Sequence, residues 1–148
     1  MNERLKALYK SEILTRSQNP AHFGEMPEAT HVLEAYNPMC GDQFKLFIQL
    51  EEKNIKSASF TGYGCAISKA STEVLTERLV GKNLMEVKQE VALFLRLISS
   101  DTVEEPDQMT TDETLLAFSG TRQHPEREQC ASLSWSELAK FLAEEEGM

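Results

Sequence analysis

The chain has 148 residues, of which 41% are hydrophobic and 26% charged, a composition that fits one compact domain with a sizeable core. Its 15 basic and 24 acidic residues give a formal net charge of −9, which argues against nucleic-acid and membrane partners. No apolar stretch approaches the ~20 residues of a membrane span, and the charged N-terminus is unlike a signal peptide, so we expect a cytoplasmic protein.

The first half of the chain predicts one helix followed by a small antiparallel sheet. The spacing of Leu5, Tyr9 and Ile13 indicates an amphipathic helix, which should end before the stretch "QNPAHFGEMP". A β-rich segment at about 32–36 follows, and apolar residues then alternate with polar ones over 44–51. The polar turn "EEKN" and the segment "IKSASFTGY" complete a hairpin, which gives a sheet of about three strands.

Two glycines separate this sheet from the first helix of the second half. We expect Gly62 and Gly64 to break the last strand, and apolar residues take up helical spacing directly after Cys65. Cys65 should therefore sit at a helix N-terminus. Further on, Asn83 and Glu86 have the spacing of a capping pair at the start of another helix.

The last third of the chain predicts an exposed excursion and then two helices. Residues 101–114 are acidic with almost no apolar anchor, and a short apolar turn follows at "LLAF". Pro125 can open a helix that carries Cys130. Ser134 and Glu137 match a capping box, which predicts that a separate final helix begins there.

The three cysteines are the residues with the most distinctive chemistry. They cannot all pair within one chain, and the reducing cytosol argues against disulfides. An extended Cys40-Gly41-Asp42 would place the thiol and the carboxylate on the same side, and the hairpin can return Cys65 to that edge. The helix dipole there favours the Cys65 thiolate. If Cys130 also approaches, three sulfurs and one carboxylate suit tetrahedral zinc.

The spacing by itself leaves two alternatives to zinc open. The cysteines could be unrelated buried or surface thiols, because free cysteine is a frequent core residue. One of them could instead be a single nucleophile, for which His22, His31 and His124 are candidate bases, although none has an identifiable orienting partner. We expect Ser68 and Ser71 to be helix-surface or capping groups, because neither lies in a nucleophile elbow.

Three motifs in order, "NPMCGD", "GYGCAISKAS" and "RQHPEREQCASLSW", resemble those of the NifU/IscU family of iron–sulfur cluster assembly proteins, and within it the SufU branch. The resemblance covers nearly the whole chain and implies that residues 1–148 form a single NifU N-terminal/IscU-like domain. It implies a SufE/NifU-like α+β fold, in which a three-stranded antiparallel sheet is covered by helices and the cysteines gather at one exposed edge. The strands and helices predicted above agree with this fold.

The resemblance also implies the site residues and the activity. The family's ligands fall on Cys40, Asp42, Cys65 and Cys130, which would hold zinc as in SufU-type proteins. Cys40 would accept persulfide sulfur from a pyridoxal-phosphate-dependent cysteine desulfurase of the SufS type, a sulfurtransferase-like activity that serves downstream iron–sulfur assembly proteins. The alternative within the family is a scaffold on which a [2Fe–2S] cluster is assembled, with a transient iron–sulfur cluster as the cofactor.

Three features of the sequence favour the sulfur-relay branch over the scaffold branch. Scaffold proteins of the family have a histidine directly before the third cysteine, where this chain has Gln129, a poor ligand for zinc or iron. The segment at about 100–120 resembles an insertion typical of the SufU branch. The "LPPVK" stretch that chaperone partners of scaffold proteins recognise does not occur in this sequence.

Two arginines near the third cysteine stand out in an acidic chain. Arg122 and Arg127 flank the stretch "QHPE", and the resemblance matches Arg127 to a family arginine three residues before the cysteine. Arg127 could form a local ion pair with Glu126, Glu128 or Glu137. The functional hypothesis is that Arg127 makes a charge-assisted contact with the desulfurase.

Overall fold

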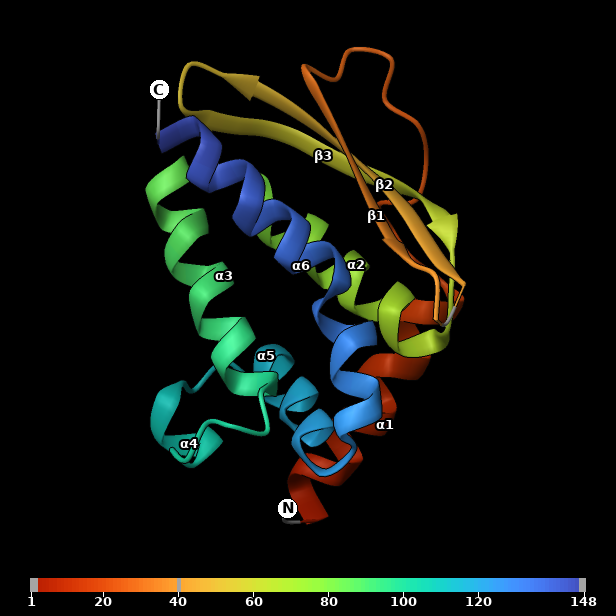
Figure 1. The fold of residues 1–148 in the computed structure, drawn as a ribbon, viewed down its shortest axis with the longest axis vertical. Helices are drawn as coiled ribbons and strands as arrows, with labels where there is room; N and C mark the ends of the chain where they lie inside the picture. Colours follow the sequence, from red (N-terminus) through yellow and green to blue (C-terminus); the bar gives the residue numbers. More distant parts are fainter. Residues whose placement is uncertain (1–2, 40, 147–148) are drawn as a thin grey trace.

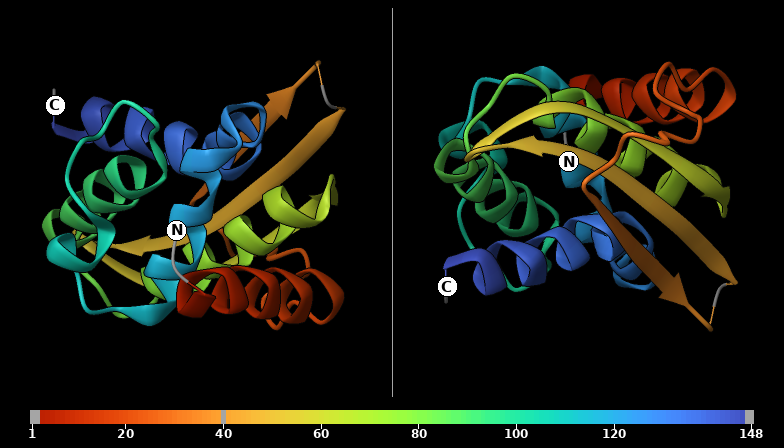
Figure 2. Two further views of the ribbon diagram at one scale, coloured as in Figure 1. Left: turned by 90° about the horizontal axis from the view of Figure 1, so that it is seen from below. Right: turned by 90° about the horizontal axis from the view of Figure 1, so that it is seen from above.

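The computed structural model describes residues 3–39 and 41–146, and it confirms the α+β fold with a three-stranded antiparallel sheet. Strands β1 (His31–Asn37), β2 (Asp42–Glu51) and β3 (Asn54–Tyr63) lie in the order β1-β2-β3. Helices α2 (Ala66–Leu79) and α6 (Pro125–Glu146) pack against the inner face of this sheet (Figures 1 and 2). The sheet therefore forms one layer and the helices form the rest of the molecule.

Alternation along β2 explains why this sheet buries one face. Phe44, Leu46 and Ile48 are almost completely buried, while the residues between them are exposed or half-buried on the outer side. The outer edge of β3 is paired near its middle, because Phe23 in the loop after the first helix forms an isolated parallel bridge with Phe60. This contact occupies the hydrogen-bonding groups of Phe60, which would otherwise be free on the strand edge.

The predicted strand break at Gly62 is wrong, because β3 continues to Tyr63. Gly62 lies inside the strand with φ +131°, and a Cβ atom there would come within 2.1 Å of the Gln43 carbonyl oxygen on β2. The glycine is needed for a close approach of two strands and does not end one.

The remaining helices pack on α2 and α6. Helix α1 (Glu3–Gln18) lies against α2, and α3 (Leu84–Ile98) lies against α6. The predicted capping box of α3 is confirmed, because the Asn83 side chain accepts from the Glu86 N–H and the Glu86 side chain accepts from the Asn83 N–H. Residues 101–114 are mostly exposed and include α4 (Pro106–Met109). The apolar turn that follows is buried in α5 (Glu113–Ala117) and the 3₁₀ helix η1 (Phe118–Gln123).

The expectation of a separate final helix beginning at Ser134 is wrong. Helix α6 opens at Pro125, as predicted, and runs without interruption to Glu146. No proline or glycine follows Pro125 within this range, so nothing stops the helix. Ser134 is buried and its hydroxyl bonds to Thr72 of α2, so it does not cap a helix end.

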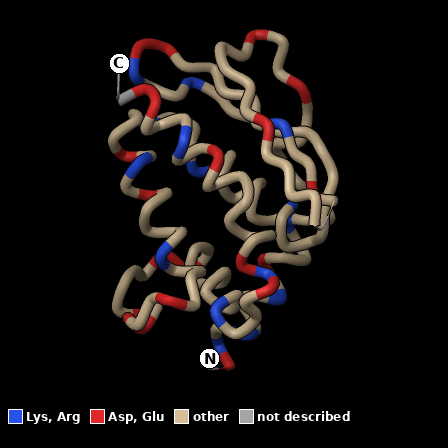
Figure 3. The backbone as a smooth tube through the Cα atoms, in the orientation of Figure 1, with Lys and Arg blue, Asp and Glu red and all other residues tan. Residues whose placement is uncertain are grey.

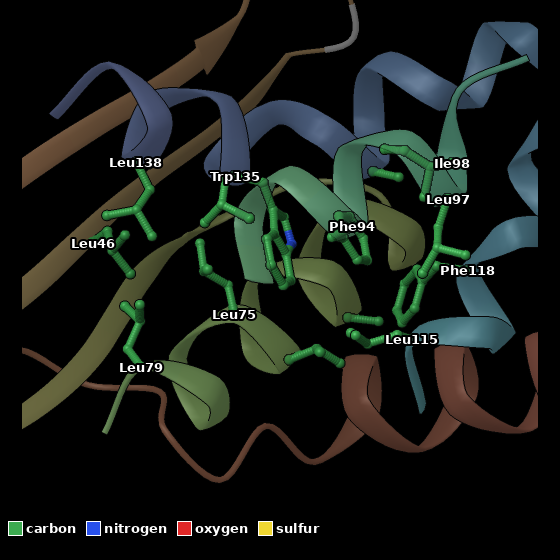
Figure 4. Packing of buried hydrophobic residues seen from close by; sticks show 14 of the residues in the cluster. Leu46, Leu75, Leu79, Phe94, Leu97, Ile98, Leu115, Phe118, Trp135 and Leu138 are labelled. Atoms are coloured by element: carbon green, nitrogen blue, oxygen red, sulfur yellow. The ribbon is translucent and has the colours of Figure 1, made fainter. Parts of the chain in front are cut away.

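The core lies between the sheet and helices α2, α3 and α6 (Figure 4). At its centre the Trp135 ring stacks on Phe94, with ring centroids 3.8 Å apart and planes 8° from parallel. The indole N–H donates to the carbonyl and hydroxyl oxygens of Ser71 at 3.1 and 2.9 Å, so this buried donor is satisfied. Within the described ranges, no helix is long and apolar enough to cross a bilayer. Acidic and basic residues are interspersed over the helices (Figure 3).

Candidate metal centre

Asp42, the first residue of β2, points a carboxylate into the protein and is only 1% exposed. Its Oδ1 accepts a hydrogen bond from the Cys65 backbone N–H at 2.9 Å. Its Oδ2 is buried and has no hydrogen-bond partner among the residues that the structure describes. A buried carboxylate oxygen without a partner is costly unless a cation or a donor reaches it. Asp42 therefore has the environment expected of a metal ligand.

Gly64 allows Asp42 and the start of α2 to come together. A Cβ atom at this position would lie 2.6 Å from both Asp42 Oδ1 and Ser68 Oγ. Any larger residue would push the carboxylate away from the Cys65 N–H. The expectation that Gly62 and Gly64 both act as breakers missed this steric role.

Cys65 is the N-cap of α2, as the sequence predicted. Its Sγ accepts from the Ser68 backbone N–H at 3.4 Å, and the Ser68 hydroxyl donates to the Cys65 carbonyl oxygen at 3.0 Å. Negative charge on the sulfur strengthens such an N-cap interaction, which also has the favourable end of the helix dipole. Cys65 is exposed, so its thiol is open to exchange reactions.

Cys130 comes to the same place from the second turn of α6 and is 7% exposed. The ligand atoms of Asp42, Cys65 and Cys130 all lie within 4.8 Å of one another. The structure thus brings together three of the four residues expected at the site, from a strand, a helix N-terminus and a distant helix. Cys65 and Cys130 are consequently neighbours, not unrelated thiols.

The fourth expected residue, Cys40, lies outside the described residues. Its neighbour Gly41 has φ +75° and donates its N–H to the Asn37 carbonyl oxygen at 2.8 Å. The assumption of an extended Cys40-Gly41-Asp42 is therefore wrong, because Gly41 belongs to a turn between β1 and β2. The position of Asp42 is determined by its pairing with Asn37 across the strands.

The histidines do not join this group of ligand atoms. His22 does have an orienting partner, contrary to expectation: its Nδ1 lies 2.7 Å from Oε2 of the buried Glu73, whose Oε1 accepts the His22 backbone N–H at 2.8 Å. This pair attaches the loop after α1 to α2. This pair could not be predicted from the sequence, because a carboxylate in the middle of a helix is usually a surface residue.

The two arginines near Cys130 have different roles. The Arg122 guanidinium donates to the carbonyl oxygens of Leu97 at 2.7 Å and Arg96 at 3.2 Å, so it caps the end of α3. Arg127 is exposed, and the Tyr9 hydroxyl beside it raises the pKa of Arg127, with smaller contributions from neighbours that include the Cys65 sulfur. Arg127 is therefore a cation at the edge of the thiol site.

The partners expected for a local ion pair with Arg127 are mostly engaged elsewhere. Glu137 pairs with Lys140 at 3.1 Å, and Glu128 accepts from the Ser100 hydroxyl at 3.5 Å. A groove of about 700 Å³ begins at the thiols and runs between α1 and the first turns of α2 and α6. Its walls are largely apolar, and Arg127 forms part of its lining.

The sequence of this chain is similar to those of a known protein family. The profile described as "NifU-like N terminal domain" matches residues 8–131. The zinc-dependent sulfurtransferase SufU of Bacillus subtilis is 34% identical over 148 residues, which cover 99% of this chain and 97% of the relative. The iron–sulfur cluster assembly scaffold protein IscU of Streptococcus pyogenes is 30% identical over 139 residues, covering 94% and 85% of the two chains.

Solved structures agree with this fold. A crystal structure titled as a putative iron–sulfur cluster assembly scaffold protein for the SUF system, from Fervidobacterium islandicum, has a TM-score of 0.78 and 27% identity. It covers 89% of this chain and 94% of its own. The topology that positions Asp42, Cys65 and Cys130 is thus shared with solved proteins.

Proposed function

Because the chain belongs to the NifU-like N-terminal domain family, we propose that it is a zinc-dependent sulfur-relay protein of iron–sulfur cluster assembly. The observation that carries this proposal is the group formed by Asp42, Cys65 and Cys130, in which one buried carboxylate oxygen has no partner among the described residues. The similarity to the Bacillus subtilis sulfurtransferase over almost the full length supports it.

The donor set suits zinc. We propose that Cys40, Asp42, Cys65 and Cys130 hold the ion, because sulfur-rich tetrahedral sites with one oxygen ligand are compatible with zinc chemistry. Zinc bound there would keep its thiol ligands deprotonated at neutral pH. Asp42 and Cys65 are linked by a hydrogen bond, so the carboxylate and the N-cap thiol are positioned together.

The proposed reaction is a thiol–persulfide exchange at Cys40. Its thiolate attacks the terminal sulfur of a persulfide on a pyridoxal-phosphate-dependent cysteine desulfurase of the SufS type. A new S–S bond forms at Cys40, the donor S–S bond breaks, and the desulfurase cysteine leaves as a thiolate, so no external oxidant or reductant is needed. Downstream iron–sulfur assembly proteins would then take the sulfur. Of the four proposed ligands, Cys40 comes directly before Gly41 in the chain, and Gly41 lies in the left-handed region with φ +75°.

We propose Arg127 as a docking residue for the desulfurase. Its guanidinium is exposed at the edge of the thiol site, and the apolar groove extends from there along α1. A carboxylate on the desulfurase could pair with it and help to align the two reacting sulfurs. We also propose that residues 100–120, which include α4, α5 and the first half of η1, are the SufU-type insertion within a single domain spanning 1–148.

The first experiment measures metal content. Protein purified under metal-replete, reducing conditions should contain one zinc per chain by elemental analysis, and strong chelators should destabilise it. Less than about a tenth of an equivalent, with all three cysteines reduced, would contradict the proposal.

The second experiment separates sulfur relay from cluster scaffolding. The wild-type protein should stimulate a SufS-type desulfurase, and Cys40→Ala should abolish the stimulation. A wild-type protein that gives no stimulation and instead assembles a stable [2Fe–2S] chromophore in place of zinc would show that the scaffold alternative is correct.

A further inference from the structure

Helices α2 and α6 carry two of the thiols, and buried hydroxyl groups join the two helices close to these thiols. The Ser71 hydroxyl donates to the Ala131 carbonyl oxygen at 2.5 Å, directly after Cys130 in the chain. The same hydroxyl accepts from the Trp135 indole N–H at 2.9 Å. Ser71 is 1% exposed, so its hydroxyl is a buried interhelix contact and neither the surface group nor the capping group expected from the sequence.

A second contact lies one turn further along α6. The hydroxyls of Thr72 and Ser134 are 2.8 Å apart, and both residues are at most 3% exposed. Thr72 Oγ1 donates to the Ser68 carbonyl oxygen at 2.8 Å, so Ser134 is the donor between them. Ser68 in turn contacts Cys65 through its backbone N–H and its hydroxyl. A continuous polar chain therefore runs from α6 to the Cys65 sulfur.

Apolar packing between α2 and α6 would not fix their relative position by itself. The hydrophobic effect is non-directional, whereas hydrogen bonds have narrow distance and angle requirements. Sliding α6 by one residue would move Cys130 by about 1.5 Å, while metal–ligand distances tolerate only about 0.2 Å. Buried hydroxyls that pair across the helices select one register, because any other register would leave them unpaired.

We propose that Ser71, Thr72 and Ser134 form a hydroxyl clamp whose function is to position Cys130 relative to Cys65, so that these two ligands are preorganised before metal binds. These are positioning residues, since they act through the cysteines and do not contact the metal. This inference rests on the proposed metal function. The spacing of the Cys65 and Cys130 thiols can nevertheless be tested without zinc.

The first arm of the test measures metal affinity. Ser71→Ala combined with Ser134→Ala should lower the affinity for Zn²⁺, measured by competition with a chelator, at least tenfold. It should also change the visible absorption of bound Co²⁺, which reports ligand geometry. The matched control is Ser119→Ala, because Ser119 is equally buried but its hydroxyl donates to the nearby Leu116 carbonyl at 2.6 Å. The control should keep wild-type affinity and spectrum even if its melting temperature falls.

The second arm needs no metal. Phenylarsine oxide bridges two thiols only when they are correctly spaced, so its affinity for metal-free Cys40→Ser protein reports the Cys65–Cys130 geometry. The clamp predicts tight binding in this background and at least fivefold weaker binding after the two serine substitutions. If the double variant does not fold, the same measurements are made on the single variants Ser71→Ala and Ser134→Ala.

The outcomes separate this inference from the proposed function. Unchanged metal affinity, Co²⁺ spectrum and arsenical affinity in the clamp variants would overturn the clamp and leave the proposed function standing. If the wild-type protein binds no zinc, the proposed function is refuted. If the affinity for phenylarsine oxide still depends on the two serines in that case, the clamp is supported. Equal losses in the clamp variants and in Ser119→Ala would also overturn it, because they would show a general stability effect.

Discussion

Asp42→Asn changes one property of the candidate metal centre while keeping its shape. The amide oxygen can still accept the Cys65 N–H, which Asp42 Oδ1 accepts at 2.9 Å. The substitution removes the negative charge, and it puts an NH₂ group in place of Oδ2. This Oδ2 is the buried acceptor oxygen that has no partner in the described structure. The variant therefore tests whether that oxygen is present for a metal ion.

The expected changes in metal affinity and in protein stability have different magnitudes. Altering a residue that only supports a metal ligand typically costs 10–100-fold in affinity, so losing a ligand should cost at least about 100-fold, or ~2.8 kcal/mol. The free energy of unfolding of the metal-free protein should change by no more than about 1 kcal/mol, since the hydrogen bond to Cys65 is kept and a buried charge is removed.

Chelator competition for Zn²⁺ and urea unfolding of the metal-free protein measure the two quantities. Asp112→Asn is the matched control, because Asp112 caps α5 by accepting from the Leu115 N–H at 3.2 Å and pairs with Arg78, away from the thiols. That control should lose stability and keep metal affinity. This role of Asp42 is ruled out if Asp42→Asn binds zinc as tightly as the wild type, or if the substitution destabilises the metal-free protein by more than the control substitution does.

Gly64→Ala should lower both zinc affinity and stability, because the alanine Cβ would lie 2.6 Å from Asp42 Oδ1. Chelator competition and thermal melting measure these two quantities, and wild-type values of both would contradict the steric role of Gly64. Arg127→Ala should leave zinc content and melting temperature nearly unchanged, while the concentration needed to stimulate the desulfurase rises about tenfold, or ~1.4 kcal/mol. A variant that stimulates at wild-type concentrations would show that Arg127 is not a docking residue, and one that loses zinc would show that it supports the metal site. Burial opposes ionisation of Asp112, but hydrogen bonds from Arg78 and from the helix N-terminus lower the pKa of Asp112 overall. The ionised Asp112 should therefore stabilise the fold above its unfolded-state pKa of about 3.9, and this contribution should be lost as pH falls through the lower folded-state pKa. The difference in unfolding free energy between wild type and Asp112→Asn should consequently shrink on acidification below about pH 4. A difference that stays constant from pH 7 to pH 2 would show that the Asp112 charge does not stabilise the fold.

The sequence by itself determined the features that depend on near neighbours in the chain. Alternation over 44–51 predicted a half-buried strand, because side chains on a strand point to opposite faces. Asn83 and Glu86 predicted the start of α3, because a capping box is closed within one turn. The N-cap position of Cys65 followed from the glycines before it and the helical spacing after it.

Only the tertiary structure decided the features that depend on packing between distant segments. The motif of Ser134 and Glu137 looks like a helix start, but α6 continues through it because Ser134 finds its partner on α2. The approach of Cys130 to Cys65 had to be assumed from the sequence, since no local spacing links residues on two different helices. The burial of the Asp42 oxygen, which has no partner in the part of the chain that the structure describes, and the steric need for Gly64 likewise depend on packing. Burial and close contact are properties of the assembled core, in which β2, α2 and α6 lie together.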